Sequence, residues 1–175
     1  NFYEPFGENV KNGINDPAKF VHGLQRYGQA VCGWIDVPAS AGAERRSGTS
    51  ISRPAEAQVI ADELQNALKE SADQTFGVIA FYSGQVEEIW QRLSDAGLAV
   101  RDSQNKWVVN PSTAWMYTNR GLPRLRIGTV DAFQGREFDV VYLSITRSGQ
   151  PTARRPNPFG FLVLPNPLTV AISRQ

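Results

Sequence analysis

The sequence has one cysteine, Cys32, and one histidine, His22, among its 175 residues. These counts exclude an internal disulfide and a zinc site built from several cysteines or histidines. Cys32 lies in an apolar stretch and is predicted to be a small core residue, and His22 is predicted to have a structural role. No apolar run approaches the roughly 18 residues that cross a membrane, and no signal segment opens the chain. We therefore expect an intracellular protein without a membrane partner.

Two sequence patterns that bind phosphate and metal are also missing. The sequence has no GxxxxGK[ST] segment, whose loop and lysine hold the phosphates of a nucleoside triphosphate. No acidic pair follows a predicted strand in the manner of a magnesium site. The chain therefore lacks a P-loop of its own. Its composition, with 41% hydrophobic and 20% charged residues, is that of a globular domain with a sizeable core.

The net charge of +1 favours no particular partner, but the charges are distributed unevenly. Residues 56–95 carry two basic and eight acidic side chains, which gives −6, and residues 101–175 carry ten basic and four acidic ones, which gives +6. This asymmetry is compatible with phosphate ligands on one side of the molecule. Two solvated faces that happen to differ in charge would give the same counts.

The first half of the sequence predicts a strand, a loop and a helix. Ala30–Val37 is rich in strand formers, and residues 38–50 are small and charged, as in a loop. Ser52 and Pro54 are helix start signals, and Glu56 falls in the first turn, where the helix dipole favours an acid. Apolar residues then recur at helical spacing: Ile60, Leu64, Ala67 and Leu68.

The second half adds further strands and another helix. Gly77–Tyr82 is typical of a buried strand, and an amphipathic helix follows it and ends near Gly97. Three more segments have strand character: Lys106–Asn110 as an edge strand, Arg124–Val130, and Val140–Thr146, whose apolar run suits a central parallel position. A loop over residues 148–160 and a helical segment over Leu168–Arg174 complete the chain.

This order of elements predicts an α/β fold with a mostly parallel sheet and helices on both faces. We expect an irregular lead-in over residues 1–28 and one domain over residues 29–175. Ligands of such sheets bind beyond the carboxyl ends of the strands. The residues that follow Tyr82, Val130 and Thr146 are therefore the predicted binding positions.

Three segments near these positions carry groups suited to nucleotides or nucleic acids. The hydroxyl of Thr129 could hold a phosphate at a strand end, and the carboxylate of Glu137 could accept hydrogen bonds from ribose. The guanidinium of Arg174 could stabilise charge on a transferring phosphoryl group. Tyr82 could stack on a base, next to a helix N-terminus that offers N–H groups to an anion. A solvated turn, a surface arginine and core aromatics are the structural alternatives.

The same segments carry a family resemblance. GTVDAFQGREFDVVYLSITRS resembles motifs V and Va of superfamily 1B helicases, the group that contains the nonsense-mediated-decay helicase. GFLVLPNPLTVAISR is similar to motif VI, GVIAFYSGQ to motif IV, and SRPAEAQVIADEL to the helix before motif IV. The segments stand in the family's order over roughly residues 30–175. The resemblance implies the second RecA-like domain of such a helicase, a three-layer P-loop NTPase-type fold that lacks the P-loop itself.

The resemblance also implies roles for individual residues. Glu137 would contact the ribose of ATP, and Arg174 would be the arginine finger. Gln134, Gly135 and Arg136 would couple the nucleotide cleft to the nucleic-acid groove. The implied contacts with a single strand of DNA or RNA are these: Thr129, Tyr82 and Gln85. The compartment would be the cytoplasm, with association to the nucleoid possible.

The resemblance further implies an upstream RecA-like domain that supplies the P-loop and holds Mg²⁺, so the isolated chain would not hydrolyse ATP. The sequence departs from the family at Ala80 and Phe81, where Thr-Pro is usual, and at Pro167, near which motif VI usually carries a basic residue. The domain would also end before its last strand. Two alternatives remain: a non-catalytic nucleic-acid-binding module, and a docking module with Trp107 and Trp115 as anchors.

Overall fold

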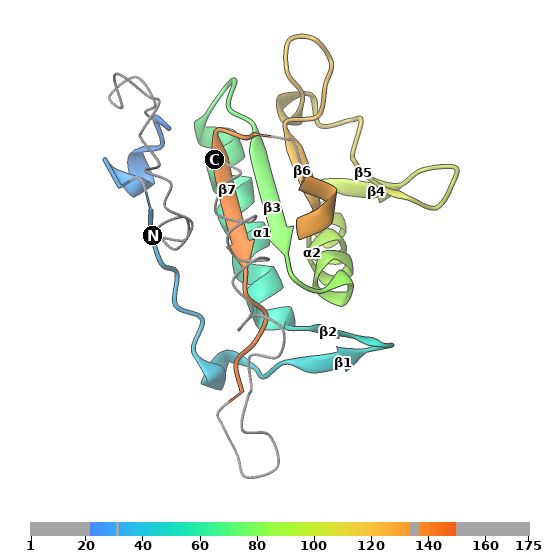
Figure 1. Ribbon diagram of the computed structural model, residues 1–175. Coiled ribbons are helices and arrows are strands. Elements are labelled where there is room, and N and C mark those ends of the chain that lie inside the picture. The colour runs from blue at the N-terminus through green and yellow to red at the C-terminus, as the bar shows by residue number, and fades with distance from the viewer. Residues whose placement is uncertain (1–21, 31, 134–136, 150–175) are drawn as a thin grey trace, which may run out of the picture.

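The computed structural model describes residues 22–30, 32–133 and 137–149. Three parallel strands form the sheet at its centre: β3 (Phe76–Ala80), β6 (Leu125–Thr129) and β7 (Val140–Ser144). Their order is β6-β3-β7, and Figure 1 shows β3 in the middle. Phe76 pairs with Leu125 on one side and with Val140 on the other, so the three strands begin at the same level. The predicted α/β class with a parallel sheet is confirmed.

Two helices cover one face of this sheet. α1 (Pro54–Glu70) begins with a proline, whose fixed φ and missing N–H suit the first helical position. α2 (Ser83–Asp95) follows β3 directly. The apolar stripe predicted for α1 is fully or almost fully buried and packs in one core with Phe76, Val78 and the apolar side of α2. Both helices thus form as their periodicity predicts.

The other face of the sheet holds a smaller core. Ile79 and Phe81 of the β3 segment pack with Phe133 there, together with half-buried residues of β7. Phe133 ends the 3₁₀ helix η6 (Val130–Phe133), which follows β6 and packs against β6 and β3. Gly77 leaves no room for a side chain, because a Cβ atom would lie 3.0 Å from Phe133 and Phe138. In the part of the chain that the structure describes, η6 is thus the helical element on this face.

Two antiparallel hairpins flank the sheet. β1 (Arg45–Ser47) pairs with β2 (Ser50–Ser52), and β4 (Ala99–Arg101) pairs with β5 (Trp107–Val109). Trp107 stacks on Trp90 of α2 with ring centroids 6.3 Å apart, and the guanidinium of Arg101 lies 3.8 Å from its ring centroid. Short 3₁₀ helices complete the elements: η3 (Gln25–Tyr27), η4 (Ala39–Ala41) and η5 (Ala114–Met116).

The segment around η3 is fastened to the body of the molecule by hydrogen bonds. The hydroxyl of Tyr27 donates to Glu63 of α1 and lies 2.9 Å from the hydroxyl of Tyr142 in β7. Burial raises the pKa of Tyr27 above its usual range, and the hydrogen bonds to Glu63 and Tyr142 raise that pKa further. His22 accepts a hydrogen bond from the N–H of Leu24, which confirms its structural role.

Four secondary-structure and burial predictions are wrong for the described residues. Residues 32–37 form no strand, because none of the described strands pairs with them, and strand propensity without a partner gives no ladder. Cys32, which is predicted to be a core residue, is exposed. Trp34 in the same segment is 81% exposed. The predicted loop over residues 38–50 contains β1. Finally, β3 rather than β7 is the central described strand, since β3 is buried throughout and β7 only partly.

Within residues 22–30, 32–133 and 137–149, no helix is both long enough and apolar enough to cross a membrane.

Candidate functional site

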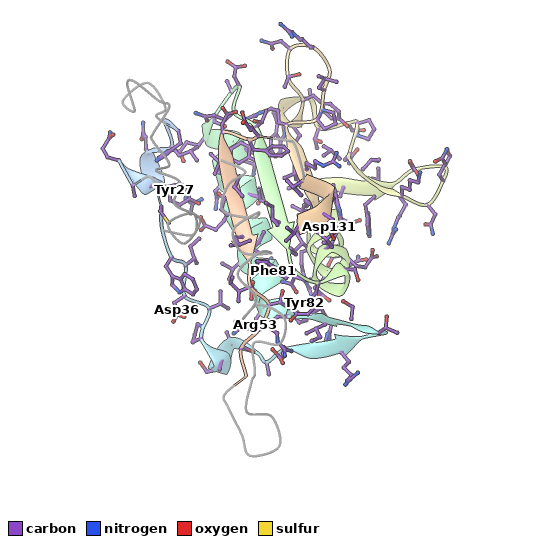
Figure 2. All side chains as sticks on the ribbon, in the orientation of Figure 1. Tyr27, Asp36, Arg53, Phe81, Tyr82 and Asp131 are labelled. Atoms are coloured by element: carbon purple, nitrogen blue, oxygen red, sulfur yellow. The ribbon has the colours of Figure 1, made fainter. Side chains whose placement is uncertain are left out.

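The carboxyl ends of the three parallel strands meet at one edge of the sheet. In the register, Ala80 lies beside Thr129 and beside Ser144, the last residues of β6 and β7. We call the residues that end or directly follow these strands the carboxyl edge. Figure 2 shows Phe81 and Tyr82 at this edge, close to Arg53 at the start of α1. The register thus brings together the strand ends after which the sequence predicts ligand-binding positions.

Tyr82 and Thr129 are half-exposed at the carboxyl edge. Tyr82 precedes α2, and its backbone carbonyl accepts hydrogen bonds from Gln85 and Val86 in the first turn of that helix. The guanidinium of Arg147 lies 5.7 Å from the centroid of the Tyr82 ring. The phenol is therefore held between the helix start and a cation, with part of its surface open to solvent.

Gln85 lies behind the carboxyl edge and not on its surface. Its side chain is fully buried, its amide oxygen accepts a hydrogen bond of 2.7 Å from the N–H of Arg53, and its amide nitrogen donates to Ser144 at 3.1 Å. Because both ends of the amide are hydrogen-bonded inside the protein, the side chain of Gln85 is not available to contact a nucleic acid in this structure. The predicted nucleic-acid contact at this position is thus corrected to a supporting role.

Glu56 is the centre of the same buried network. Its carboxylate accepts hydrogen bonds from the hydroxyl of Ser144 at 2.6 Å and from the N–H of Thr146 at 3.0 and 3.1 Å. Arg53 lies 3.7 Å from it as an ion-pair partner. A buried carboxylate with these partners fixes the direction in which the chain leaves β7.

Thr146 has an unusual backbone conformation, with a φ of 68°. For a β-branched residue, positive φ is a genuine outlier, and such strain costs on the order of 1–3 kcal/mol. The Thr146 N–H donates to both carboxylate oxygens of Glu56, which hold it in place, and the side chain of Thr146 is fully buried. Its hydroxyl oxygen has no hydrogen-bond partner among the described residues.

A second carboxylate holds the next two residues. Glu44, just before β1, accepts hydrogen bonds from the side chain of Arg147 at 2.9 Å and from the N–H of Ser148 at 3.1 Å. The hydroxyl of Ser148 in turn accepts a bond from the N–H of Glu44 at 3.2 Å. Glu44 and Arg147 are almost buried, with side chains 11% and 6% exposed. The β1–β2 hairpin and the chain that leaves β7 are therefore joined by a reciprocal clamp.

Arg53 joins the hairpin to the segment before it. Its guanidinium donates to the backbone carbonyls of Val37, Pro38 and Gly42 at 2.7 to 2.9 Å, and its side chain is only 5% exposed. A buried arginine that donates hydrogen bonds to three carbonyls is a rigid support. Arg53 thereby fixes the chain on both sides of the hairpin.

The predicted nucleotide-binding residues lie elsewhere or outside the described residues. Glu137 is exposed and precedes β7, and two residues later the carboxylate of Asp139 binds the N–H of Thr75, just before β3, at 2.7 Å. Glu137 therefore lies toward the amino ends of the strands, away from Tyr82 and Thr129. The other predicted positions, which lie outside the described residues, are Gln134, Gly135, Arg136 and Arg174.

The amino edge, where the parallel strands begin, has a shallow cavity of about 350 Å³. Its lining residues include Asp73, Gln74 and Asp139. Two carboxylates in an open cavity repel phosphate groups. This cavity therefore does not match the anionic ligands that the sequence motifs indicate.

Sequence reasoning missed the two carboxylates that hold the chain leaving β7, Glu56 and Glu44. The sequence pattern explains Glu56 only as a favourable charge in a first helical turn. A sharper signal was present, because Glu56 stands four residues before Ile60 and so falls on the buried stripe of α1. An acid on a buried stripe must have hydrogen-bond partners. No comparable local signal identified Glu44, because its partners stand more than 100 positions further along the chain.

Known proteins match the chain over most of its length. Residues 4–175 match the model of a family described as the AAA domain. The chain belongs to this family. Over 137 residues, the AAA-family chain is also 26% identical to an uncharacterized ATP-dependent helicase of Caenorhabditis elegans, and the match covers 76% of this chain. The chain spans only 7% of that relative's length.

These matches support the family resemblance that the motifs carried. With the parallel β6-β3-β7 sheet, they identify this AAA-family chain as a superfamily 1 helicase-like domain with a RecA-like fold. The order of the motifs in the sequence and the family match over residues 4–175 indicate the same family. The predicted family and fold class are thus confirmed.

Proposed function

We propose that this chain is the second motor domain of an ATP-dependent superfamily 1 helicase. The observation that carries the proposal is the DAFQGRE segment between β6 and β7, in a chain that belongs to the family. In this proposal, an upstream RecA-like domain supplies the P-loop and holds Mg²⁺. The present chain closes over the nucleotide from the other side and is inactive as an ATPase alone.

The nucleotide contacts would come from the segment before β7 and from motif VI. The exposed carboxylate of Glu137 suits hydrogen bonds with ribose hydroxyls. Arg174 would supply a planar guanidinium to the γ-phosphate as charge develops during phosphoryl transfer. Gln134, Gly135 and Arg136 would link this contact to the strand-binding residues.

The strand contacts would come from the carboxyl edge. The half-exposed hydroxyl of Thr129 can donate a hydrogen bond to a phosphate, and the open part of the Tyr82 ring can stack on a base. Glu137 lies toward the opposite end of the sheet. Nucleotide and strand would therefore bind at different ends of the domain, and closure of the two domains around ATP would move the strand contacts.

Steady-state ATP turnover of the full-length protein, measured with and without single-stranded DNA or RNA, tests the proposal. A motor hydrolyses ATP, and its rate of hydrolysis rises when single-stranded nucleic acid is added. Replacement of Glu137 by alanine should then raise KM for ATP more than for an analogue that lacks the ribose hydroxyls, because only ATP loses a contact. A full-length protein that binds a strand but shows no turnover would contradict the proposal.

One observation favours a second candidate, a non-catalytic nucleic-acid-binding module. Ala80 and Phe81 stand where motif IV usually has Thr-Pro, and both are buried, with exposures of 0% and 7%. The end of β3 therefore offers no hydroxyl at these positions, and the group that could touch a phosphate of the nucleic acid is lost. Strand affinity that is the same with and without ATP analogues would support this second function.

A further inference from the structure

We propose that the β1–β2 hairpin is a phosphate-binding arm, which contacts the sugar–phosphate backbone of a single strand through Arg46 and Arg45. This inference rests on the proposed function, because it adds a contact to the strand groove of the carboxyl edge. None of the helicase motifs in the sequence includes β1, and the two arginines fall in a segment that the sequence predicted to be a loop. The structure makes them part of an ordered antiparallel pair.

The hairpin is attached directly to the carboxyl edge. The hydroxyl of Ser50 accepts a hydrogen bond of 3.0 Å from the N–H of Gly84, in the first turn of α2 and two residues from Tyr82. The N–H of Arg53, which follows β2, donates to Gln85 in the same turn. Figure 1 shows the hairpin at the end of the sheet to which the strand arrows point. A strand that contacts Tyr82 would therefore pass close to β1.

The two arginines present positive charge on both faces of the hairpin. Arg45 and Arg46 are exposed neighbours, and neighbouring residues of a strand point to opposite faces. Arg45 lies toward α2, where its guanidinium is 3.1 Å from Glu88, but its side chain is still 61% exposed. Arg46 has no ion-pair partner within residues 22–30, 32–133 and 137–149. Its donors are available to a phosphate, which a guanidinium binds bidentately.

Hydrogen bonds hold both ends of the arm. Its turn contains Gly48 with a φ of 60°, a conformation that glycine adopts without strain. The clamp of Glu44 with Arg147 and Ser148 holds the chain before β1, and the bonds of Arg53 to three carbonyls hold the chain after β2. A preorganised arm loses little conformational entropy on binding, so its cations contribute more fully to affinity.

The same guanidinium chemistry would suit either of two phosphate sources, a nucleic-acid backbone or the bound nucleotide. The position of the hairpin favours the nucleic-acid backbone, because the hairpin adjoins Tyr82. The proposed ribose contact, Glu137, lies toward the other end of the sheet. A backbone is also an extended polyanion, and cations on both faces of a narrow hairpin suit a chain that passes across it. The experiment separates the two sources.

The test is the salt dependence of single-strand binding by the full-length protein. Affinities for a fluorescent oligothymidylate are measured between low and moderate salt for wild type, Arg46→Ala and Arg46→Lys. Because each phosphate contact on a single strand contributes a slope of about 0.7 in the logarithm of affinity against the logarithm of salt concentration, Arg46→Ala should flatten the slope by about that amount. Arg46→Lys should retain most of it, since the charge remains.

Arg120→Ala is the matched control. Arg120 is an exposed arginine before β6, at the amino edge, so its loss removes the same charge far from the carboxyl edge. The inference is overturned if Arg46→Ala and Arg120→Ala have equal slopes, or if Arg46→Ala changes KM for ATP while strand affinity is unchanged. If the wild-type protein binds no single strand at all, the proposed function itself is contradicted. If the wild-type affinity falls with salt and that of Arg46→Ala falls with the same slope, only the hairpin inference is contradicted.

Discussion

Some side chains at the carboxyl edge are partly exposed, and others behind it support the edge. Glu56 and Gln85 are buried and use their polar atoms on neighbouring elements, whereas Tyr82 and Thr129 keep part of their surface open. The sequence could predict that polar groups gather at this edge, because parallel strands end together. It could not distinguish support from contact at Gln85, because that depends on Ser144, which is 59 positions away.

Replacement of Glu56 by glutamine should destabilise the fold. The amide cannot accept from Ser144 and Thr146 with both of its heavy atoms, and hydrogen bonds to a charged group contribute about 1.5–3 kcal/mol each. We expect a loss of about 2 kcal/mol in the free energy of unfolding, measured by urea titration. Asp62→Asn, at an exposed position of the same helix, should change stability by less than about 0.5 kcal/mol. Equal effects of both substitutions would disprove the central role of Glu56.

Tyr27 should make the stability depend on alkaline pH. The raised pKa of its hydroxyl means that the folded state retains a proton that the unfolded chain releases above about pH 10. This contribution is complete below that pH and is lost as the pH rises further. Tyr27→Phe should therefore be less stable than wild type near neutral pH and lose less stability between pH 9 and 11. The free energy of unfolding is measured by chemical denaturation at each pH. If it declines equally in the two proteins, Tyr27 is not responsible.

Among the elements, those with a strong local pattern were predictable and those fixed by distant partners were not. α1 has start signals and an apolar stripe, and β3 is an apolar run, so both form where the sequence predicts them. The segment 32–37 has equally clear strand formers but no described strand beside it. β1 is short and polar, and the residue before it, Glu44, is held by Ser148, a partner too distant in the sequence to give a local signal.

The close packing of η6 on β3 predicts the effect of a single methyl group. Gly77→Ala places a Cβ atom 3.0 Å from the rings of Phe133 and Phe138, which are held in the second core. Such overpacking costs about 1–3 kcal/mol. In Gly33→Ala the added Cβ atom meets nothing within 4 Å, so stability should be unchanged. Thermal unfolding of the two variants compares them, and a Gly77→Ala protein as stable as wild type would refute the tight fit.

For the whole molecule, the family and the fold class were predictable because four motifs stand in order and the elements alternate between strand and helix. The docking alternative was weighed on Trp107 and Trp115. In the structure both pack against the main core, with Trp107 between Trp90 and Arg101, so neither is free to anchor a partner as an isolated exposed ring.

The rate of ATP hydrolysis by Arg174→Ala in the full-length protein, at saturating ATP and saturating single strand, tests the motor role most directly. An arginine finger is worth roughly 10³–10⁵ in rate, so turnover should fall by about that factor while strand affinity stays within about twofold of wild type. Arg174→Lys should restore little of the rate, because lysine lacks the planar fork. Turnover of Arg174→Ala equal to that of wild type, with normal strand binding, would contradict the account.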